Sequence, residues 1–310
     1  MILQRQLSGD PNHFNPSQDM KGQTQCIPYN TKREIERSAF TVQEIIGSGN
    51  FGNVFKGELT GLYRSDEKIT VAIKSMNDPS NEDHLMDFLG EIKIMSNITP
   101  HINLVNMIGS CTSEFTEYEE LWVLIEFCQH GDLLSHLIKN REKIVPECEK
   151  DPIIGRRLIQ WSYDIAKGMQ YLARNHIMHG DLAARNVLIG DDPLHSGYRV
   201  AKIADFGLSK KYYDNIKYNK QKRNYLPWKW MALEYLRDDY FTMTSDVWSF
   251  GIVVWEILST GKDPYGHQSY DATVEQLENG YRLPCPAHAK NICSWPEEQF
   301  YNPLSKMCFI

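Results

Sequence analysis

The feature that most constrains the fold is a change in hydrophobic pattern about one third of the way along the chain. Before the change, short runs rich in β-branched and aromatic residues predict strands, and one stretch has helical spacing. After it, apolar residues recur at helical spacing in longer stretches. The predicted strands cover residues 40–46, 70–74 and 121–127, and the predicted helices cover residues 85–98, 157–175 and 245–260. This order predicts an α+β fold with two lobes.

Composition places the chain among ordinary globular proteins and excludes few functions. Its 310 residues are 42% hydrophobic and 24% charged, which is enough to build a buried core. The formal net charge of −7 argues against a general nucleic-acid binder, which would carry a basic surface. The seven cysteines form no C-x-x-C pair, which favours reduced thiols in a cytosolic compartment.

Three further features bear on membranes and domain boundaries. Residues 1–19 are polar and lack a signal-peptide pattern. The longest apolar run, 251–258, contains Glu256 and is far shorter than the roughly 20 residues of a spanning helix, so we expect no transmembrane segment within this chain. Residues 1–38 are polar with little apolar periodicity, and they are predicted to form a flexible lead-in to a folded domain over 39–310.

A glycine-rich segment follows the first predicted strand and fits the pattern G-x-G-x-x-G-x-V. Glycines let the backbone approach a phosphate group closely and adopt positive φ, but they also occur in many ordinary turns. A dinucleotide-binding loop would lead directly into a helix. Residues 54–59 instead favour a strand, which suits a strand–loop–strand lid over ATP. The segment consists of Gly47, Ser48, Gly49, Asn50, Phe51, Gly52, Asn53 and Val54.

Lys74 ends a short apolar strand, so its amine is expected to be partly buried and to need an anionic partner. A lysine in such a place is more often an ordinary edge-strand residue. Glu91 is the preferred partner, because its apolar neighbours in the predicted helix would turn that face inward; Glu82 and Asp87 are the alternatives. A Lys74–Glu91 pair would hold the amine toward the α- and β-phosphates of ATP.

Three polar residues, Asp181, Asn186 and Asp205, follow in order, each beside a short apolar strand. Taken singly, each also fits an ordinary turn. Phosphoryl transfer needs positioning and charge neutralisation more than covalent chemistry from the protein. Asp181 can orient a substrate hydroxyl and accept its proton, whereas Asn186 and Asp205 offer the hard oxygen ligands that Mg²⁺ prefers.

Together these motifs resemble those of the eukaryotic protein kinase family over about residues 40–309. The resemblance implies a bilobal fold, with a small β-rich N-lobe over about 39–127 and a larger, mostly helical C-lobe over about 128–310. The motifs that match in order and spacing are the glycine-rich segment, Lys74, residues 181–186, residues 205–207, residues 230–234 and residues 245–251.

The subclass also follows from the resemblance. Residues 181–186 read D-L-A-A-R-N, a form similar to that of tyrosine kinases, whereas serine/threonine kinases usually place a lysine two residues after the aspartate. Residues 226–231 resemble the tyrosine-kinase segment that makes room for a phenol ring. Residues 126–133 resemble the hinge of growth-factor receptor kinases, and residues 27–29 resemble their juxtamembrane segment.

By this resemblance the site residues acquire expected roles. Ile125 is the gatekeeper at the back of the ATP pocket, and backbone groups of Glu126 and Cys128 bind the adenine. The expected catalytic residues are Asp181, Lys74, Arg185, Asn186 and Glu91, and the expected Mg²⁺ ligands are Asn186 and Asp205. The residues expected to contact ATP are Gly47, Ser48, Gly49, Asn50, Phe51, Gly52, Val54, Ala72, Lys74, Ile125, Glu126, Cys128, Arg185, Asn186 and Asp205.

The resemblance further implies ATP and Mg²⁺ as cofactors and tyrosine-containing proteins as substrates. Phosphotyrosine-binding adaptor proteins are expected partners, and a nucleic acid is not. If the chain belongs to a receptor, we expect it on the cytoplasmic side of a membrane and able to dimerise through its parent.

Three departures from the family pattern keep other readings open. Position 180 is glycine where most relatives carry an arginine that pairs with a phosphate on the activation loop, and Leu233 replaces a proline. Residues 300–309 resemble the penultimate helix of the family, so the last helix is expected to be missing. These departures favour a non-catalytic kinase-like scaffold as the alternative. A serine/threonine or dual-specificity kinase is disfavoured by residues 183–185.

Overall fold

A computed structural model of the chain divides into two compact units, Met1–Gln129 and His130–Ile310. The residues that the structure describes are 7–10, 24, 26–48, 52–62, 64, 66–76, 78, 80–115, 120–150, 152–206, 227–238, 242–286 and 289. Several expectations lie outside these residues: those for Gly49, Asn50 and Phe51, for Gly207, and for the helix at 300–309. Within the described part of the chain, the structure contains no helix with the length and apolar character needed to cross a membrane.

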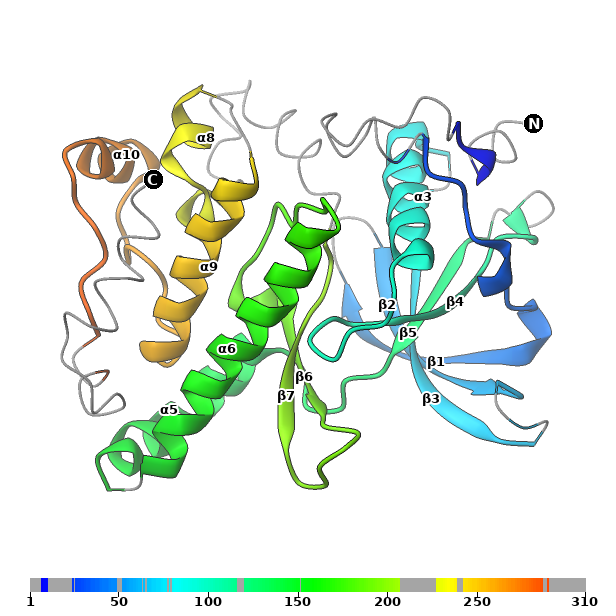
Figure 1. Cartoon of the computed structure of the whole chain (residues 1–310), viewed down its shortest axis with the longest axis horizontal. Helices are drawn as coiled ribbons and strands as arrows, with labels where there is room; N and C mark the ends of the chain where they lie inside the picture. Colours follow the sequence, from blue (N-terminus) through cyan, green and yellow to red (C-terminus); the bar gives the residue numbers. More distant parts are fainter. Residues whose placement is uncertain are drawn as a thin grey trace. The chain divides into compact units, whose positions relative to one another are not determined.

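The first unit contains a five-stranded antiparallel sheet, with strand order β1-β2-β3-β5-β4 (Figure 1). The strand bounds are β1 Phe40–Ser48, β2 Gly52–Thr60, β3 Lys68–Met76, β4 Met107–Cys111 and β5 Trp122–Glu126. The helix α3 (Glu82–Asn97) contacts β3 and β4. The predicted strands and the predicted helix at 85–98 are therefore confirmed.

One face of this sheet packs into an apolar core. Residues Ile35 and Ala39, which precede β1, pack against the same core. At Gly109 on β4 a Cβ atom would lie only 2.4 Å from the Cδ1 atom of Ile35, so the small residue permits the close approach. The buried core residues are Phe40, Leu59, Val71, Ile73, Cys111 and Leu124.

The segment before β1 is also bound to β4 through polar contacts. The Tyr29 hydroxyl donates to Glu34 Oε2 at 2.7 Å, and Glu34 Oε1 accepts from the Thr112 amide at 2.7 Å. The Ile35 amide donates to the Ser110 carbonyl at 2.8 Å. Polar composition predicts a flexible lead-in over 1–38, but its described part from residue 26 onward is packed. The reason is that its few apolar side chains complete the core of the sheet. Its polar groups form hydrogen bonds with strand groups that would otherwise need another partner.

The second unit is mostly helical (Figure 1). Its long helices are α5 Leu133–Lys150, α6 Pro152–Arg174 and α9 Met243–Leu258, and its shorter ones are α8 Leu233–Asp238 and α10 Tyr270–Glu278. The helix α6 contacts α5, α9 and a two-stranded hairpin, β6 Val187–Asp191 and β7 Arg199–Ile203. The predicted helices at 157–175 and 245–260 are confirmed by α6 and α9.

The helix α9 is buried over much of its length, because most of its residues are apolar. Its first turn has a capping box, in which the side chains of Thr242 and Ser245 bond each other's backbone amides. A strand-rich first unit and a helix-rich second unit confirm the predicted α+β class.

Candidate active site

The strand register of the first unit aligns several predicted nucleotide-contacting residues. Gly47 on β1 pairs with Val54 on β2, and Val54 pairs with Lys74 on β3. Ala72, two residues before Lys74, pairs with Ile125 on β5. Directly paired residues lie on the same face of a sheet, and so do residues two apart on one strand. Val54, Lys74, Ala72 and Ile125 therefore share one face.

Lys74 is paired with Glu91 on α3. Its Nζ atom lies 2.7 Å from Glu91 Oε1 and 2.8 Å from Oε2. The two side chains are only 11% and 9% exposed, so the interaction is shielded from water. Removing one partner would leave the other charge buried, which typically costs about 3–5 kcal/mol. The structure thus selects Glu91 from the three acidic residues considered for Lys74.

Gly52 and Glu126 are held by close backbone contacts. A Cβ atom at Gly52 would lie 1.7 Å from the Ser75 carbonyl oxygen, so only glycine fits where β2 meets β3. The Glu126 amide donates to the Asn106 carbonyl at 3.0 Å. Any contact of the Glu126 backbone with adenine must therefore use its carbonyl oxygen. Cys128 lies just beyond β5 and is buried.

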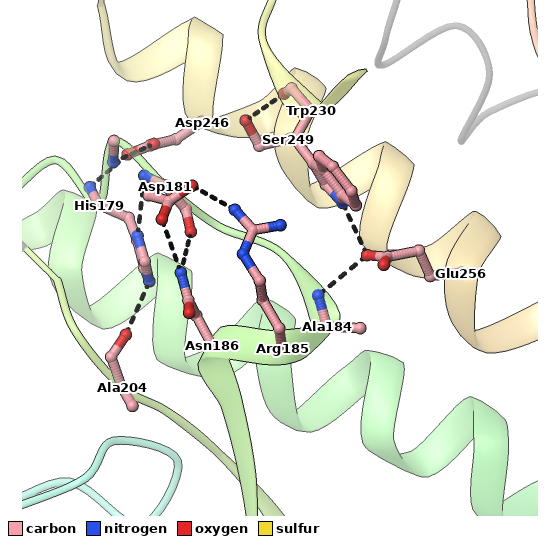
Figure 2. Close-up of polar contacts among 11 residues, drawn as sticks. His179, Asp181, Ala184, Arg185, Asn186, Ala204, Trp230, Asp246, Ser249 and Glu256 are labelled. Carbon is pink, nitrogen blue, oxygen red and sulfur yellow. Dashed lines mark hydrogen bonds and ion pairs between the residues drawn. The ribbon is translucent and has the colours of Figure 1, made fainter. Parts of the chain in front are cut away.

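Three predicted residues of the second unit meet in one cluster just before β6 (Figure 2). Arg185 Nη2 donates to Asp181 Oδ1 at 2.7 Å. Asn186 Nδ2 donates to Asp181 Oδ2 at 2.9 Å and to its carbonyl oxygen at 2.7 Å. The one-turn helix η4 (Ala184–Asn186) brings these side chains back onto Asp181. The Asp181 carboxylate is therefore oriented by two charged or polar donors.

Asp205 lies next to this cluster through the β6–β7 hairpin. Val187 pairs with Ile203, and the Ala204 amide donates to the Asn186 carbonyl at 2.9 Å. Asp205 therefore follows directly after the residue bonded to Asn186. Its φ is +53°, in the left-handed region that aspartate tolerates better than most residues.

His179 connects the loop to the end of β7. Burial lowers the pKa of its imidazole to about 4, so the ring is neutral at pH 7. Its Nδ1 accepts from the Asp181 amide at 3.2 Å, which assigns the ring proton to Nε2. Nε2 lies 3.1 Å from the Ala204 carbonyl oxygen, to which it donates. One neutral imidazole thus links the residue before Asp205 to the backbone of Asp181.

Two carboxylates from α9 hold the backbone of this loop (Figure 2). Asp246 accepts from the His179 amide at 2.7 Å through Oδ2 and from the Gly180 amide at 2.9 Å through Oδ1. Glu256 accepts from the Ala184 amide at 2.9 Å. Burial raises the pKa of Asp246 to about 6 and that of Glu256 to about 7. The loop is therefore anchored on both sides of Asp181.

The sequence pattern predicts no role for either carboxylate. Asp246 is part of a motif that matches the family, and Glu256 is a single charge within an apolar run. A carboxylate in a helix that is otherwise apolar has to find buried donors, because its burial without them is costly. That signal could have marked both residues as anchors, but it does not say which backbone amides they bind.

Gly180 has φ of +81°, a backbone conformation in which a residue with a Cβ atom is strained. We expect Gly180→Ala to lower the free energy of unfolding by about 1 kcal/mol. Gly47→Ala is the matched control, because a Cβ there would lie at an ordinary 3.7 Å from Val54. Urea unfolding of both variants measures the effect. Equal stability of Gly180→Ala and the parent chain would contradict this prediction.

Each unit thus holds its own group of the residues predicted for phosphotransfer. The first holds the Lys74–Glu91 pair and the aligned strand residues. The second holds Asp181, Arg185 and Asn186. Asp205 directly follows Ala204, whose amide donates to the Asn186 carbonyl.

The chain belongs to the protein tyrosine and serine/threonine kinase family, whose family model matches residues 40–294. Several of its curated relatives are named as receptors. It is 38% identical over 270 residues to a fibroblast growth factor receptor of Ciona intestinalis, a match that covers 83% of this chain and 35% of the relative.

Two other relatives match at a similar level. A tyrosine kinase receptor, Cad96Ca, of Drosophila melanogaster is 32% identical over 286 residues, covering 89% of this chain and 34% of the relative. An angiopoietin-1 receptor of Danio rerio is 35% identical over 286 residues, covering 87% of this chain and 24% of the relative. The chain spans about a third or less of the length of these relatives.

Proposed function

We propose that this chain is a protein tyrosine kinase domain of the receptor type, which transfers the γ-phosphoryl group of ATP to tyrosine hydroxyls of proteins. The observation that carries the proposal is the Asp181 carboxylate held by Arg185 and Asn186 at 2.7 and 2.9 Å. A carboxylate fixed in this way is suited to orient a hydroxyl and accept its proton.

The chemistry follows from Asp181. As the tyrosyl oxygen bonds to the terminal phosphorus, Asp181 takes the hydroxyl proton, and the bridging oxygen leaves with ADP. The contacts from Arg185 and Asn186 keep the carboxylate in one orientation, so little reorganisation accompanies the reaction. Asp246 and His179 support the same loop through its backbone.

The residues proposed to hold Mg²⁺ have suitable chemistry. Asn186 turns its amide nitrogen toward Asp181, so its oxygen is on the opposite branch of the amide group. Asp205 supplies a carboxylate one residue beyond the Ala204 amide that binds Asn186. Mg²⁺ is commonly held by one or two such oxygens together with substrate phosphates. When bound, it neutralises charge on the phosphates.

The nucleotide is proposed to bind against the first unit. The shared face of Val54, Ala72 and Ile125 offers apolar contacts for a base, and Lys74 brings a fixed positive charge to the same face. Glu91 keeps the amine in place and satisfies it in its buried setting. Gly47 and Gly52 belong to the glycine-rich segment that is proposed to cover the phosphates.

The names of the relatives extend the proposal to the cellular setting. A receptor parent would place this domain on the cytoplasmic side of a membrane, permit dimerisation, and make phosphotyrosine-binding adaptor proteins its partners. A second candidate, the non-catalytic scaffold, draws on Gly180, which stands where the kinase-family pattern implies an arginine.

The test is a transfer assay with the purified chain, radiolabelled ATP and Mg²⁺, using a glutamate–tyrosine polymer and a serine/threonine-rich protein as separate acceptors. We expect label on tyrosine and none above background on serine or threonine. Omission of Mg²⁺ is the control for spontaneous labelling.

Each other outcome favours a different function. Label mainly on serine or threonine would overturn tyrosine specificity. No label on either acceptor, from chain that melts cooperatively, would favour the scaffold.

A further inference from the structure

We propose that Thr24 and residues 26–36, here called the strap, hold α3 against the sheet and so keep Glu91 on Lys74. The proposal rests on the proposed function, because the Lys74–Glu91 pair is proposed to position the phosphates of ATP. It assigns a supporting role in catalysis to a segment whose polar composition predicts only a flexible lead-in. The strap, α3 and the sheet all belong to the first unit of the chain.

The strap is bound along one side of α3. Lys93 Nζ donates to the Thr24 carbonyl at 2.7 Å, and Asn97 Nδ2 donates to the Pro28 carbonyl at 2.7 Å. The Asn30 side chain donates to a backbone carbonyl in the same turn of the helix at 3.2 Å. Lys93 and Asn97 are four residues apart, so they are neighbours on the helix surface. The strap therefore contacts the second half of α3 at three points.

Glu91 lies on the opposite side of the same helix. Residues two apart in an α-helix are rotated by about 200° around its axis, so Glu91 and Lys93 point in nearly opposite directions. Glu91 reaches Lys74 on β3 at 2.7 Å, whereas Lys93 reaches the strap. The helix α3 is therefore held between the sheet and the strap by two residues of a single turn.

The other end of the strap is fixed to β4. The Tyr29 hydroxyl lies 2.8 Å from Ser110 Oγ, and the Ile35 amide donates to the Ser110 carbonyl at 2.8 Å. Glu34 accepts from the Thr112 amide at 2.7 Å and from its hydroxyl at 2.9 Å. Because β4 pairs with β5, and β5 with β3, the strap connects the outer side of α3 to the sheet that binds its inner side.

The burial of Lys93 argues against a purely space-filling role for this residue. Lys93 is 2% exposed, and burial lowers the pKa of its amine to about 8. A methionine has a similar length and would fill the same space without a charge to remove from water. The lysine is therefore better explained by its bond to the strap carbonyl than by packing.

Lys93→Met is a variant in which stability and activity should not move together. It removes the donor to Thr24 and the buried charge at once, so we expect a melting temperature equal to or above that of the parent chain. With the glutamate–tyrosine polymer we expect its kcat/KM for ATP to fall about fivefold, because α3 loses an attachment. Glu82→Gln, at an exposed position in the first turn of α3, is the matched control and should equal the parent in both measurements.

The sign of the activity change decides between two roles of the strap. A rise of kcat/KM in Lys93→Met would show that the strap restrains the enzyme and would overturn the proposal, and so would a parent-like value. If Lys93→Met does not fold, Asn97→Ala removes another contact at an exposed position. It should lower kcat/KM about threefold, and a parent-like value would count against the proposal.

A double-mutant cycle tests whether the strap acts through Glu91. In a Glu91→Gln background, Lys93→Met should change kcat/KM by less than about twofold, because the pair that the strap supports is already weakened. An equal loss in both backgrounds would mean that the strap acts by another route, and the proposal would then be wrong.

Hydrogen exchange gives a readout that does not depend on activity. In Lys93→Met we expect faster exchange in peptides that cover residues 26–36 and the last two turns of α3, with parent-like exchange in β6 and β7. Unchanged protection of the strap and α3 would refute the proposal. If the parent chain transfers no phosphate, the proposed function fails, and the exchange data still decide whether the strap holds α3.

Discussion

Asp181→Asn is expected to lower kcat for tyrosine phosphorylation by about 10³-fold, because the amide cannot accept the hydroxyl proton. Its side chain would also present an NH₂ group to a site already filled by donors from Arg185 and Asn186. One of these contacts is therefore lost. Initial rates with the glutamate–tyrosine polymer at saturating ATP measure the effect.

The controls separate lost chemistry from lost structure. Asp271→Asn makes the same chemical change at an exposed position in the first turn of α10 and should keep full activity. Nucleotide affinity, from fluorescence titration with a labelled ATP analogue, should change little in Asp181→Asn. A kcat within threefold of the parent would remove Asp181 from the reaction and with it the main support for the proposed function.

Asp246→Asn is expected to lower the free energy of unfolding by about 2 kcal/mol at pH 7. Both oxygens of Asp246 accept backbone amides, from His179 and Gly180. An asparagine keeps one acceptor and turns its NH₂ group toward the other amide, which leaves two buried donors facing each other. The loop carrying Asp181 should shift, and we expect kcat to fall by about 10²-fold. Urea unfolding and the tyrosine assay measure the two effects.

The pH dependence of this variant has a definite sign. The pKa of Asp246 is about 6 in the folded chain and 3.8 ordinarily, so the folded state binds its proton more tightly. The contribution of this group to stability is full below pH 3.8 and is lost as the pH rises through 6. The stability difference between the parent and Asp246→Asn should therefore be larger at pH 5 than at pH 7, by about 1 kcal/mol. A difference that shrinks toward pH 5 would contradict the buried setting of this carboxyl group.

Much of the architecture could be predicted because its signals are local. Hydrophobic periodicity predicts the long helices and the strands at 40–46, 70–74 and 121–127. This periodicity reports the exposure of one residue relative to its near neighbours. Glu91 can also be predicted as the anionic partner of Lys74 from a local pattern, because its apolar neighbours in the predicted helix turn that carboxylate inward. The structure places the two charged groups 2.7 Å apart.

The packing of the segment before β1 had no comparable signal. Tyr29, Glu34 and Ile35 sit in a polar stretch, and their partners on β4 lie about 80 residues further along the chain. Composition reports how much apolar surface a segment can bury, but not whether a sheet elsewhere exposes a matching face.

The anchors of the catalytic loop were likewise decided by tertiary structure. The order of Asp181, Asn186 and Asp205 along the chain was enough to predict phosphoryl-transfer chemistry, because the required residue types and their spacing are properties of the sequence. The orientation of Asp181 depends on Asp246 and Glu256, which meet the loop only when α9 packs beneath it. A buried carboxylate needs donors wherever the fold supplies them, so its partners are set by packing and not by distance along the chain.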